Sequence, residues 1–168
     1  HTPHLRIVDP SKFDDTCEQP KDIPAEAMSI TELTREAASQ GVILSMENSG
    51  QPIRSMALLV QEARNQLSSE EGSYLGLCPD ATNQLRGFPE SDPLAELDAV
   101  PLDMLKIVHF KQARDGKAYP TVDTGDLDCL KMLSLLEAKN YQGAAIMEIP
   151  PAPEVLENLS ASFAYLRS

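Results

Sequence analysis

Five short apolar runs recur along the chain, and each is bounded by charged residues, proline or glycine. A run of four to eight apolar residues with turn signals at its ends is typical of a buried strand. In these runs the apolar residues do not alternate with polar ones, as expected for strands that lie under helices. The predicted strands span residues 4–8, 42–47, 74–80, 105–109 and 143–149.

Segments with apolar residues at helical spacing separate the predicted strands. Some open with residues that cap helices, such as Ser29 three positions before Glu32, or Asp126 before a run of regularly spaced leucines. The predicted helices begin near Ser29, Ile53, Asp92, Asp126 and Pro151. Residues 111–124 are polar instead, and they predict a loop that is too long for a simple connection.

The predicted elements alternate between strand and helix, which implies a parallel sheet. A closed eight-unit barrel typically needs about 250 residues, whereas these 168 residues hold five strand–helix units. We therefore predict an α/β fold: a (β/α)8 TIM barrel, of which this chain covers about the last five βα units, as a single domain over residues 1–168. Three alternatives stay open for the other units: they are missing from this sequence, a partner supplies them, or the sheet is open.

An acidic residue or a histidine stands at the carboxyl end of four consecutive predicted strands. These residues are Glu47, Asp80, His109 and Glu148. A single acid at such a place is usually a helix cap or a solvated loop residue, but four in succession favour a site, because the strand ends of a parallel barrel meet at one mouth. Three carboxylates without a cation would repel one another, and a divalent ion relieves that repulsion. This ligand set suits Mn²⁺, Mg²⁺, Co²⁺ or Zn²⁺.

Charge and composition narrow the range of partners. The net charge is −12 and the pI is about 4.6. A DNA duplex carries one negative charge per roughly 1.7 Å, so we expect no nucleic-acid partner. No apolar run approaches the roughly 20 residues of a membrane helix, so no membrane partner is expected. Three widely spaced cysteines predict reduced thiols and a cytoplasmic protein, with a homo-oligomer left open. The start at His1 rather than Met predicts a processed, trimmed or partial chain.

Five short segments carry a family resemblance that covers nearly the whole chain. They are Met46-Glu47-Asn48, Leu77-Cys78-Pro79-Asp80, Val108-His109-Phe110-Lys111, Thr124-Gly125-Asp126-Leu127-Asp128, and Tyr141-Gln142-Gly143 with Met147-Glu148. In order and spacing they resemble the xylose isomerase-like TIM barrels, the sugar phosphate isomerase/epimerase superfamily, from the fourth strand to the eighth. That family holds its metal with Glu, Asp, His and Glu on the last four strands. The resemblance places these ligands at Glu47, Asp80, His109 and Glu148.

The resemblance also implies an activity, that of a metal-dependent sugar or sugar phosphate isomerase or epimerase. Glu47 and Glu148 would be its catalytic pair, flanking a small polyhydroxy carbonyl compound and moving a proton off and onto the carbon next to the carbonyl. The physical logic is general, since a metal polarises the carbonyl and stabilises an enediolate intermediate while the carboxylates transfer the proton.

Three further residues are candidates for substrate binding. Arg114 follows His109 in the loop where the family often places a basic substrate contact. Lys111 either faces the substrate or forms an ion pair with a barrel helix. Asn83 stands where family members often carry a histidine, and Gln112 stands where many carry an aspartate. Both amides can bond a hydroxyl group, but neither can carry a proton near neutral pH.

Three competing functions fit parts of the same pattern. A lyase of the superfamily, which would dehydrate an inosose or 3-dehydroshikimate, starts with the same proton abstraction. The endonuclease IV branch needs a histidine-rich cluster of zinc ions, which the three histidines and the acidic charge of this chain disfavour. A non-catalytic, degenerate barrel is favoured by the incomplete set of units and disfavoured by the presence of all four ligand types.

Overall fold

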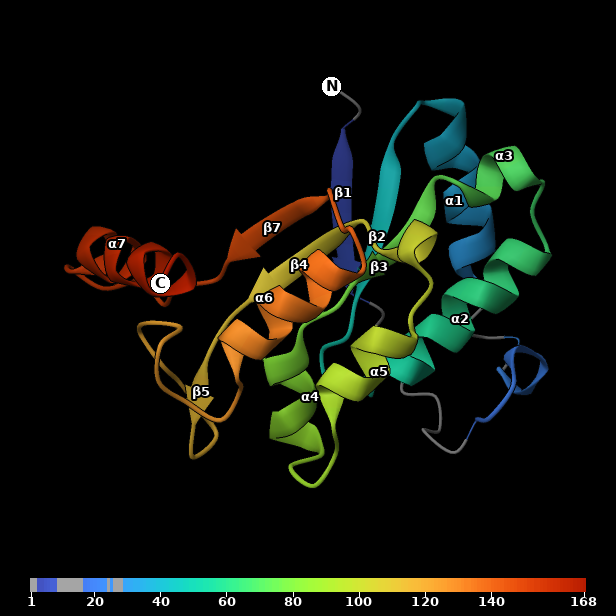
Figure 1. The fold of residues 1–168 in the computed structure, drawn as a ribbon. Coiled ribbons are helices and arrows are strands. Elements are labelled where there is room, and N and C mark those ends of the chain that lie inside the picture. Colours follow the sequence, from blue (N-terminus) through green and yellow to red (C-terminus); the bar gives the residue numbers. More distant parts are fainter. Residues whose placement is uncertain (1–2, 9–16, 24, 26–28) are drawn as a thin grey trace.

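The computed structural model describes residues 3–8, 17–23, 25 and 29–168 (Figure 1). Five strands alternate with helices along the chain, and a short hairpin of two further strands follows the fourth. The strands are β1 (His4–Val8), β2 (Ile43–Glu47), β3 (Leu75–Cys78), β4 (Ile107–Phe110), β5 (Ala113–Arg114), β6 (Lys117–Ala118) and β7 (Ala144–Met147). The helices are η1 (Pro20–Asp22), α1 (Ser29–Ser39), α2 (Ile53–Asn65), α3 (Ser69–Gly72), α4 (Ala81–Gly87), α5 (Pro93–Ala99), η3 (Leu102–Met104), α6 (Cys129–Ala138) and α7 (Val155–Leu166).

The long strands are parallel and lie side by side in the order of the sequence. β1, β2 and β3 form one ladder, and β4 and β7 form another. A single parallel bridge between Leu77 and Leu105 joins the two ladders, and the Lys106 N–H donates to the Leu77 carbonyl at 3.0 Å. The predicted parallel arrangement is therefore confirmed, and all five strands place their carboxyl ends on the same edge.

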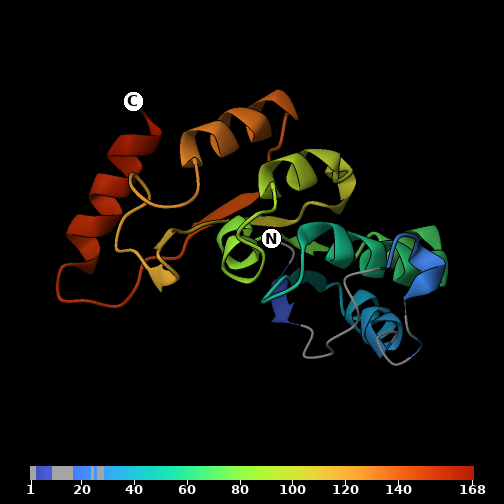
Figure 2. The same ribbon diagram turned by 90° about the horizontal axis from the view of Figure 1, so that it is seen from below.

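Helices cover one side of this curved arrangement. Seen from below, α1, α2, α5 and α6 follow one another around the strands, with α7 set apart beyond β7 (Figure 2). The predicted apolar face of α2 packs against β2, β3 and α5. Its residues Met56, Leu59, Val60 and Ala63 are at most 1% exposed. Burying such side chains, at roughly 25 cal/mol per Å² of apolar surface, holds the helix layer on the sheet.

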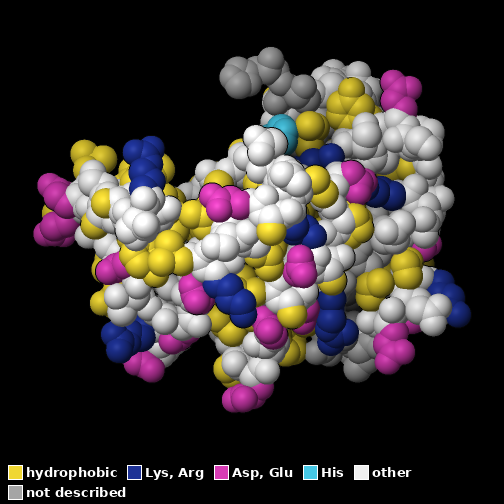
Figure 3. All heavy atoms as spheres, viewed as in Figure 1, with side chains coloured by type: hydrophobic (Ala, Val, Ile, Leu, Met, Phe, Trp, Pro, Cys, Tyr) yellow, Lys and Arg dark blue, Asp and Glu magenta, His cyan; other side chains and the backbone are white. Residues whose placement is uncertain are grey.

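Burial is deepest at the middle of the sheet and shallow at its two edges. Every residue of β3 and β4 is buried, whereas β1 and β7 are largely exposed. Large apolar side chains are open to solvent on both edge strands and on α7, including Leu5, Val8, Ile146 and Leu156. Hydrophobic side chains also gather over the region of β7 and α7 in Figure 3. The deepest burial therefore lies at β3 and β4, the strands that lead to Asp80 and carry His109.

Three local features differ from what the sequence predicted. The loop predicted over residues 111–124 contains the hairpin β5–β6, whose turn residues Asp115 and Gly116 both have positive φ, at 50° and 73°. This Asp-Gly pair is itself a strong hairpin signal. Helix α4, which starts directly after Asp80, was not predicted. The cap of α6 is Asp128 rather than Asp126, because the N–H of Asp126 donates to the Ala113 carbonyl and holds that residue in the preceding loop.

Gly76 in β3 is required by close packing, because a Cβ there would lie 2.4 Å from both the Lys106 side chain and the Met104 carbonyl oxygen. We expect Gly76→Ala to lower the free energy of unfolding by about 1–3 kcal/mol, the usual cost of overpacking. Urea denaturation measures the difference. Gly50→Ala is the matched control, since nothing lies within 4 Å of its Cβ position. Equal stability of the two variants would contradict the packing argument.

Candidate metal centre

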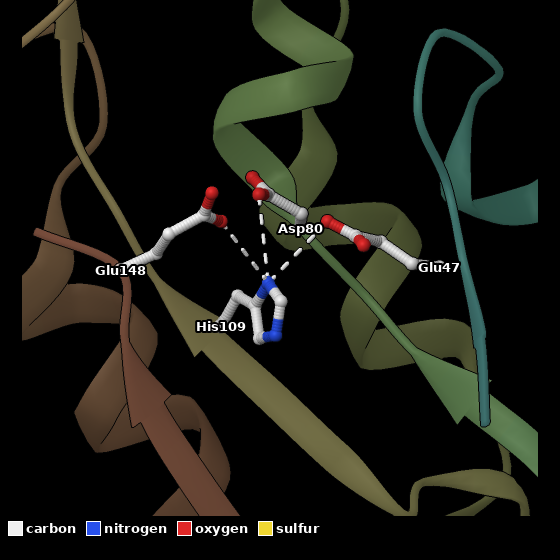
Figure 4. Close-up of side chains that lie close together, drawn as sticks. All are labelled: Glu47, Asp80, His109 and Glu148. Atoms are coloured by element: carbon white, nitrogen blue, oxygen red, sulfur yellow. Dashed lines mark ion pairs between the residues drawn. The ribbon is translucent and has the colours of Figure 1, made fainter. Parts of the chain in front are cut away.

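Four polar side chains from neighbouring strands converge at the carboxyl edge of the sheet (Figure 4). One ligand atom from each of Glu47, Asp80, His109 and Glu148 lies within 4.8 Å of the other three. The Nδ1 atom of His109 stands 3.4 Å from Glu47 Oε1, 3.5 Å from Glu148 Oε2 and 3.8 Å from Asp80 Oδ2. The structure thus brings together the four residues that the sequence singled out.

Their positions relative to the strands differ from the prediction. Glu47 is the last residue of β2, as expected. His109 lies inside β4 rather than at its end, because the strand runs on to Phe110. Asp80 and Glu148 stand beyond the ends of β3 and β7. Convergence therefore depends on the loops after two strands as well as on the strands.

Two local structures fix Asp80. Its Oδ1 atom accepts a hydrogen bond from the Asn83 N–H at 2.8 Å and so caps α4. The Asn48 amide pairs with the backbone of Asp80 in both directions, accepting from its N–H at 2.8 Å and donating to its carbonyl at 2.9 Å. The remaining oxygen, Oδ2, is buried and makes no hydrogen bond within the described part of the chain. Helix capping thus uses one carboxylate oxygen and leaves the other facing the cluster.

Glu47 is held in a similar way by different partners. Its side chain is only 4% exposed. The Oε1 atom accepts from the Asn83 side-chain amide at 3.3 Å and faces His109. The Oε2 atom pairs with the Arg6 guanidinium, which reaches across from β1. Arg6 and Asn48 are thus two residues of this region that the sequence did not single out as site residues. Asn48 directly follows Glu47, whereas the place of Arg6 depends on strand register.

Glu148 is the least restrained of the three acids. Its side chain is 44% exposed, and its backbone N–H donates to the Phe110 carbonyl at 2.9 Å. The Oε2 atom accepts from Lys111 Nζ at 3.2 Å. Its Oε1 atom makes no hydrogen bond to any described residue. One oxygen of Glu148 is therefore open to an incoming molecule.

The electrostatics of His109 show that the cluster favours positive charge. Burial lowers the pKa of His109, but the side chains of Asp80, Cys78 and Glu47 outweigh burial and raise the pKa to about 11. Neither ring nitrogen has a hydrogen-bond partner among the described residues. The facing carboxylate oxygens lie 3.4 to 3.8 Å from Nδ1, too far for good hydrogen bonds in the present geometry.

The spacing of these atoms fits a bound cation. Two ligand atoms about 2.1 Å from one ion lie roughly 3.4 Å apart at the tetrahedral angle. The three distances from Nδ1 of His109, 3.4, 3.5 and 3.8 Å, lie close to that value. Two of the facing atoms, Asp80 Oδ2 and His109 Nδ1, are buried without a hydrogen bond in the described structure. A divalent cation would satisfy both, so the residues present fit a metal ion.

The three predicted substrate-binding residues, and Gln112 near them in the sequence, lie in different surroundings. Lys111 Nζ lies 3.3 Å from Asn83 Oδ1 and 3.5 Å from Asp80 Oδ2, in addition to its contact with Glu148, so Lys111 and Asn83 belong to the cluster's surroundings. Arg114 lies exposed on β5, and the described structure shows no contact between it and the four residues. Gln112 points elsewhere, because its buried amide bonds both backbone groups of Leu127.

Parallel strands, outer helices and an acid–histidine cluster at the carboxyl edge define a protein built like part of a (β/α) barrel. A family model described as "Xylose isomerase-like TIM barrel" matches residues 6–168. The chain therefore belongs to the xylose isomerase-like TIM barrel family, which confirms both the resemblance and the predicted fold.

Solved structures with the same fold are distant in sequence. A xylose isomerase domain protein from Planctomyces limnophilus is 16% identical with a TM-score of 0.74, and the match covers 98% of this chain and 58% of that one. The 3-keto-D-glucoside 4-epimerase YcjR from E. coli is 20% identical with a TM-score of 0.60, over 84% and 51% of the two chains. The IolI protein with a binding zinc atom is 16% identical with a TM-score of 0.62, over 98% and 60%.

These likenesses show the fold. The chain spans between 51% and 60% of the length of the three structures. No match was found among curated proteins. In the part of the chain that the structure describes, no helix has both the length and the apolar character needed to cross a membrane.

The paired hydrogen bonds of Asn48 generate a stability prediction. Asn48→Ala would leave the buried N–H of Asp80 without a partner and its carbonyl with only the Gln84 N–H at 3.3 Å, and we expect the free energy of unfolding to fall by about 1–3 kcal/mol. Chemical denaturation measures the loss. Asn65→Ala is the control, because the Asn65 amide lies on the surface and bonds only to side chains of its own helix, α2. A variant at Asn48 as stable as the control would show that this pairing does not fix Asp80.

Proposed function

We propose that the protein is a divalent-metal-dependent isomerase or epimerase that acts on a small polyhydroxy carbonyl compound. Glu47, Asp80, His109 and Glu148 would be the metal ligands. The observation that carries the proposal is the convergence of these four side chains, with Asp80 Oδ2 and His109 Nδ1 buried and without a hydrogen bond within the described structure. The solved 3-keto-D-glucoside 4-epimerase and the zinc-containing IolI protein, which share the fold, support a sugar-like substrate and a metal.

The ligand set defines which metals fit. Carboxylate oxygens and one imidazole nitrogen accommodate Mn²⁺, Mg²⁺, Co²⁺ or Zn²⁺. When bound, such an ion would polarise the substrate carbonyl and stabilise the negative charge that develops on its oxygen. The surrounding residues then need only bind the substrate, orient it and move its proton.

Glu47 and Glu148 are the proposed proton-transfer groups, and their surroundings differ. Glu148 has an oxygen without a described partner and an exposed side chain, so it is the accessible base for a hydrogen on the carbon next to the carbonyl. Glu47 is buried and paired with Arg6, and we propose that it stands on the other side of the substrate. A general base must come within hydrogen-bond reach of its proton, which the open oxygen of Glu148 permits.

Substrate hydroxyl groups need polar partners beside the two acids. Lys111 and Asn83 meet this need, since the Lys111 ammonium and the Asn83 amide already contact the acidic side chains. Arg114 stays a proposed substrate contact from the resemblance alone, and its exposed place on the β5–β6 hairpin would allow it to meet a substrate that extends outward.

Metal dependence is the most direct test of the function. We expect a chelator to abolish turnover of ketoses, inososes or related polyhydroxy carbonyl compounds, and Mn²⁺ or Co²⁺ to restore it. Calorimetry should show one ion bound per chain, and His109→Ala should weaken that binding by at least tenfold because it removes the only nitrogen ligand. Activity that is indifferent to chelator and metal would remove the ion from the mechanism.

Replacing the accessible acid tests its proposed role. We expect Glu148→Gln to lower kcat by at least about 100-fold, because an amide cannot accept the proton, with the fold preserved since the residue is half exposed. Turnover and circular dichroism measure the two effects. Glu137→Gln, a change of the same kind on the exposed surface of α6, should leave kcat unchanged. Full activity of Glu148→Gln would exclude this residue as the base.

A further inference from the structure

Arg6 is an unexpected basic residue at the edge of the metal centre. It lies on β1, two residues before Val8, and Val8 is the register partner of Glu47 on β2. Residues two apart on a strand share one face of the sheet, so Arg6 lies diagonally opposite Glu47 on the same face, within reach of a long side chain. The guanidinium pairs with Glu47 Oε2.

Because of this contact, the two carboxylate oxygens of Glu47 have different partners. Oε2 is taken by Arg6, and Oε1 faces His109 Nδ1 at 3.4 Å and the Asn83 amide at 3.3 Å. The terminal torsion of a glutamate is broad and roughly two-fold, so an unpaired carboxylate could turn and present either oxygen or both. Pairing with Arg6 removes that freedom. Asp80 reaches the same arrangement by another route, with Oδ1 used as a helix cap.

We infer that Arg6 is a positioning residue for the metal centre, which holds Glu47 so that a single oxygen, Oε1, faces the ion. The inference rests on the proposed metal site and assigns no contact between Arg6 and substrate. Mutating a residue that hydrogen-bonds to a metal ligand and orients it typically lowers metal affinity 10- to 100-fold. As a purely structural ion pair, by contrast, the half-exposed Arg6 would contribute little.

If Arg6 orients Glu47, removing Arg6 should change metal affinity in the opposite direction from what is expected if Arg6 acts only as a counter-charge. A positive charge beside the site repels a cation, so if Arg6 were only a counter-charge, its loss would tighten metal binding. If Arg6 orients Glu47, its loss weakens binding in spite of the relieved repulsion. The sign of the change in Mn²⁺ affinity therefore separates the two roles, and no substrate is needed.

The experiment is a calorimetric titration of the full chain with Mn²⁺. We expect Arg6→Met, which can neither donate a hydrogen bond nor carry charge, to weaken binding by about tenfold or more. Arg6→Gln keeps an N–H donor without the charge and should recover most of that loss. Arg54→Met is the matched control, because Arg54 is 48% exposed, against 46% for Arg6, and pairs with Glu96 away from the centre. Its affinity should equal that of the parent chain.

Unchanged or tighter Mn²⁺ binding by Arg6→Met would overturn the inference while leaving the proposed metal enzyme intact. A parent chain that binds no divalent ion would overturn the proposed function itself, and the inference with it. Melting temperatures of the metal-free variants show whether each is folded. Were Arg6→Met to misfold, Arg6→Ala takes its place: Mn²⁺ binding about tenfold weaker than that of the parent supports orientation, and unchanged or tighter binding refutes it.

Discussion

The electrostatic repulsion among three neighbouring carboxylates is the constraint on which this site depends. Removing an ion from water costs on the order of several kcal/mol even after relaxation, and Glu47 and Asp80 are both almost fully buried. Their oxygens nevertheless gather around one imidazole together with Glu148. Such an arrangement persists only where positive charge is supplied. Arg6 and Lys111 supply part of it, and a divalent ion would supply the rest.

The parallel sheet is what allows these charges to meet. Each strand delivers its carboxyl end to the same edge, and the ladder order follows the sequence order, so successive strands place their polar residues next to one another. The buried faces of β3 and β4 and the apolar face of α2 anchor the middle of the sheet. Close packing at Gly76 keeps β3 against the segment that leads into β4. Core and site are therefore built by the same strands.

Much of this could be predicted from the sequence, because apolar runs identify buried strands and a polar residue at the end of such a run stands out. Glu47, Asp80, His109 and Glu148 were recognised in that way. Helix α4 was not predicted, because Asp80 was interpreted as the end of a strand although it also caps the helix that follows. The β5–β6 hairpin was missed although its Asp-Gly turn is a hairpin signal, because length and polarity favoured a loop.

The pairing partners could not be predicted, because they depend on register rather than on local pattern. Nothing in the residues around Arg6 shows that Val8 stands opposite Glu47, and a shift of one residue would turn Arg6 to the other face of the sheet. Gln112 is the opposite case. It stands at a position of a family motif, but its side chain bonds the backbone of Leu127 and does not join the site. Sequence pattern identifies which residues reach the edge, but it does not identify the side chains that orient them.

The three acids form a graded series of restraint. Asp80 is fixed by its place at the start of a helix and by Asn48, and Glu47 by an ion pair across two strands. Glu148, on a loop beyond β7, keeps one oxygen without a partner in the described structure. Fixed carboxylates suit metal ligation, which needs constant geometry, whereas proton transfer needs an oxygen that a substrate can reach. In the proposed function, Glu148 would therefore be the more accessible of the two proton-transfer groups and Glu47 the more restrained one. The difference arises from the partners of each acid rather than from the acids themselves.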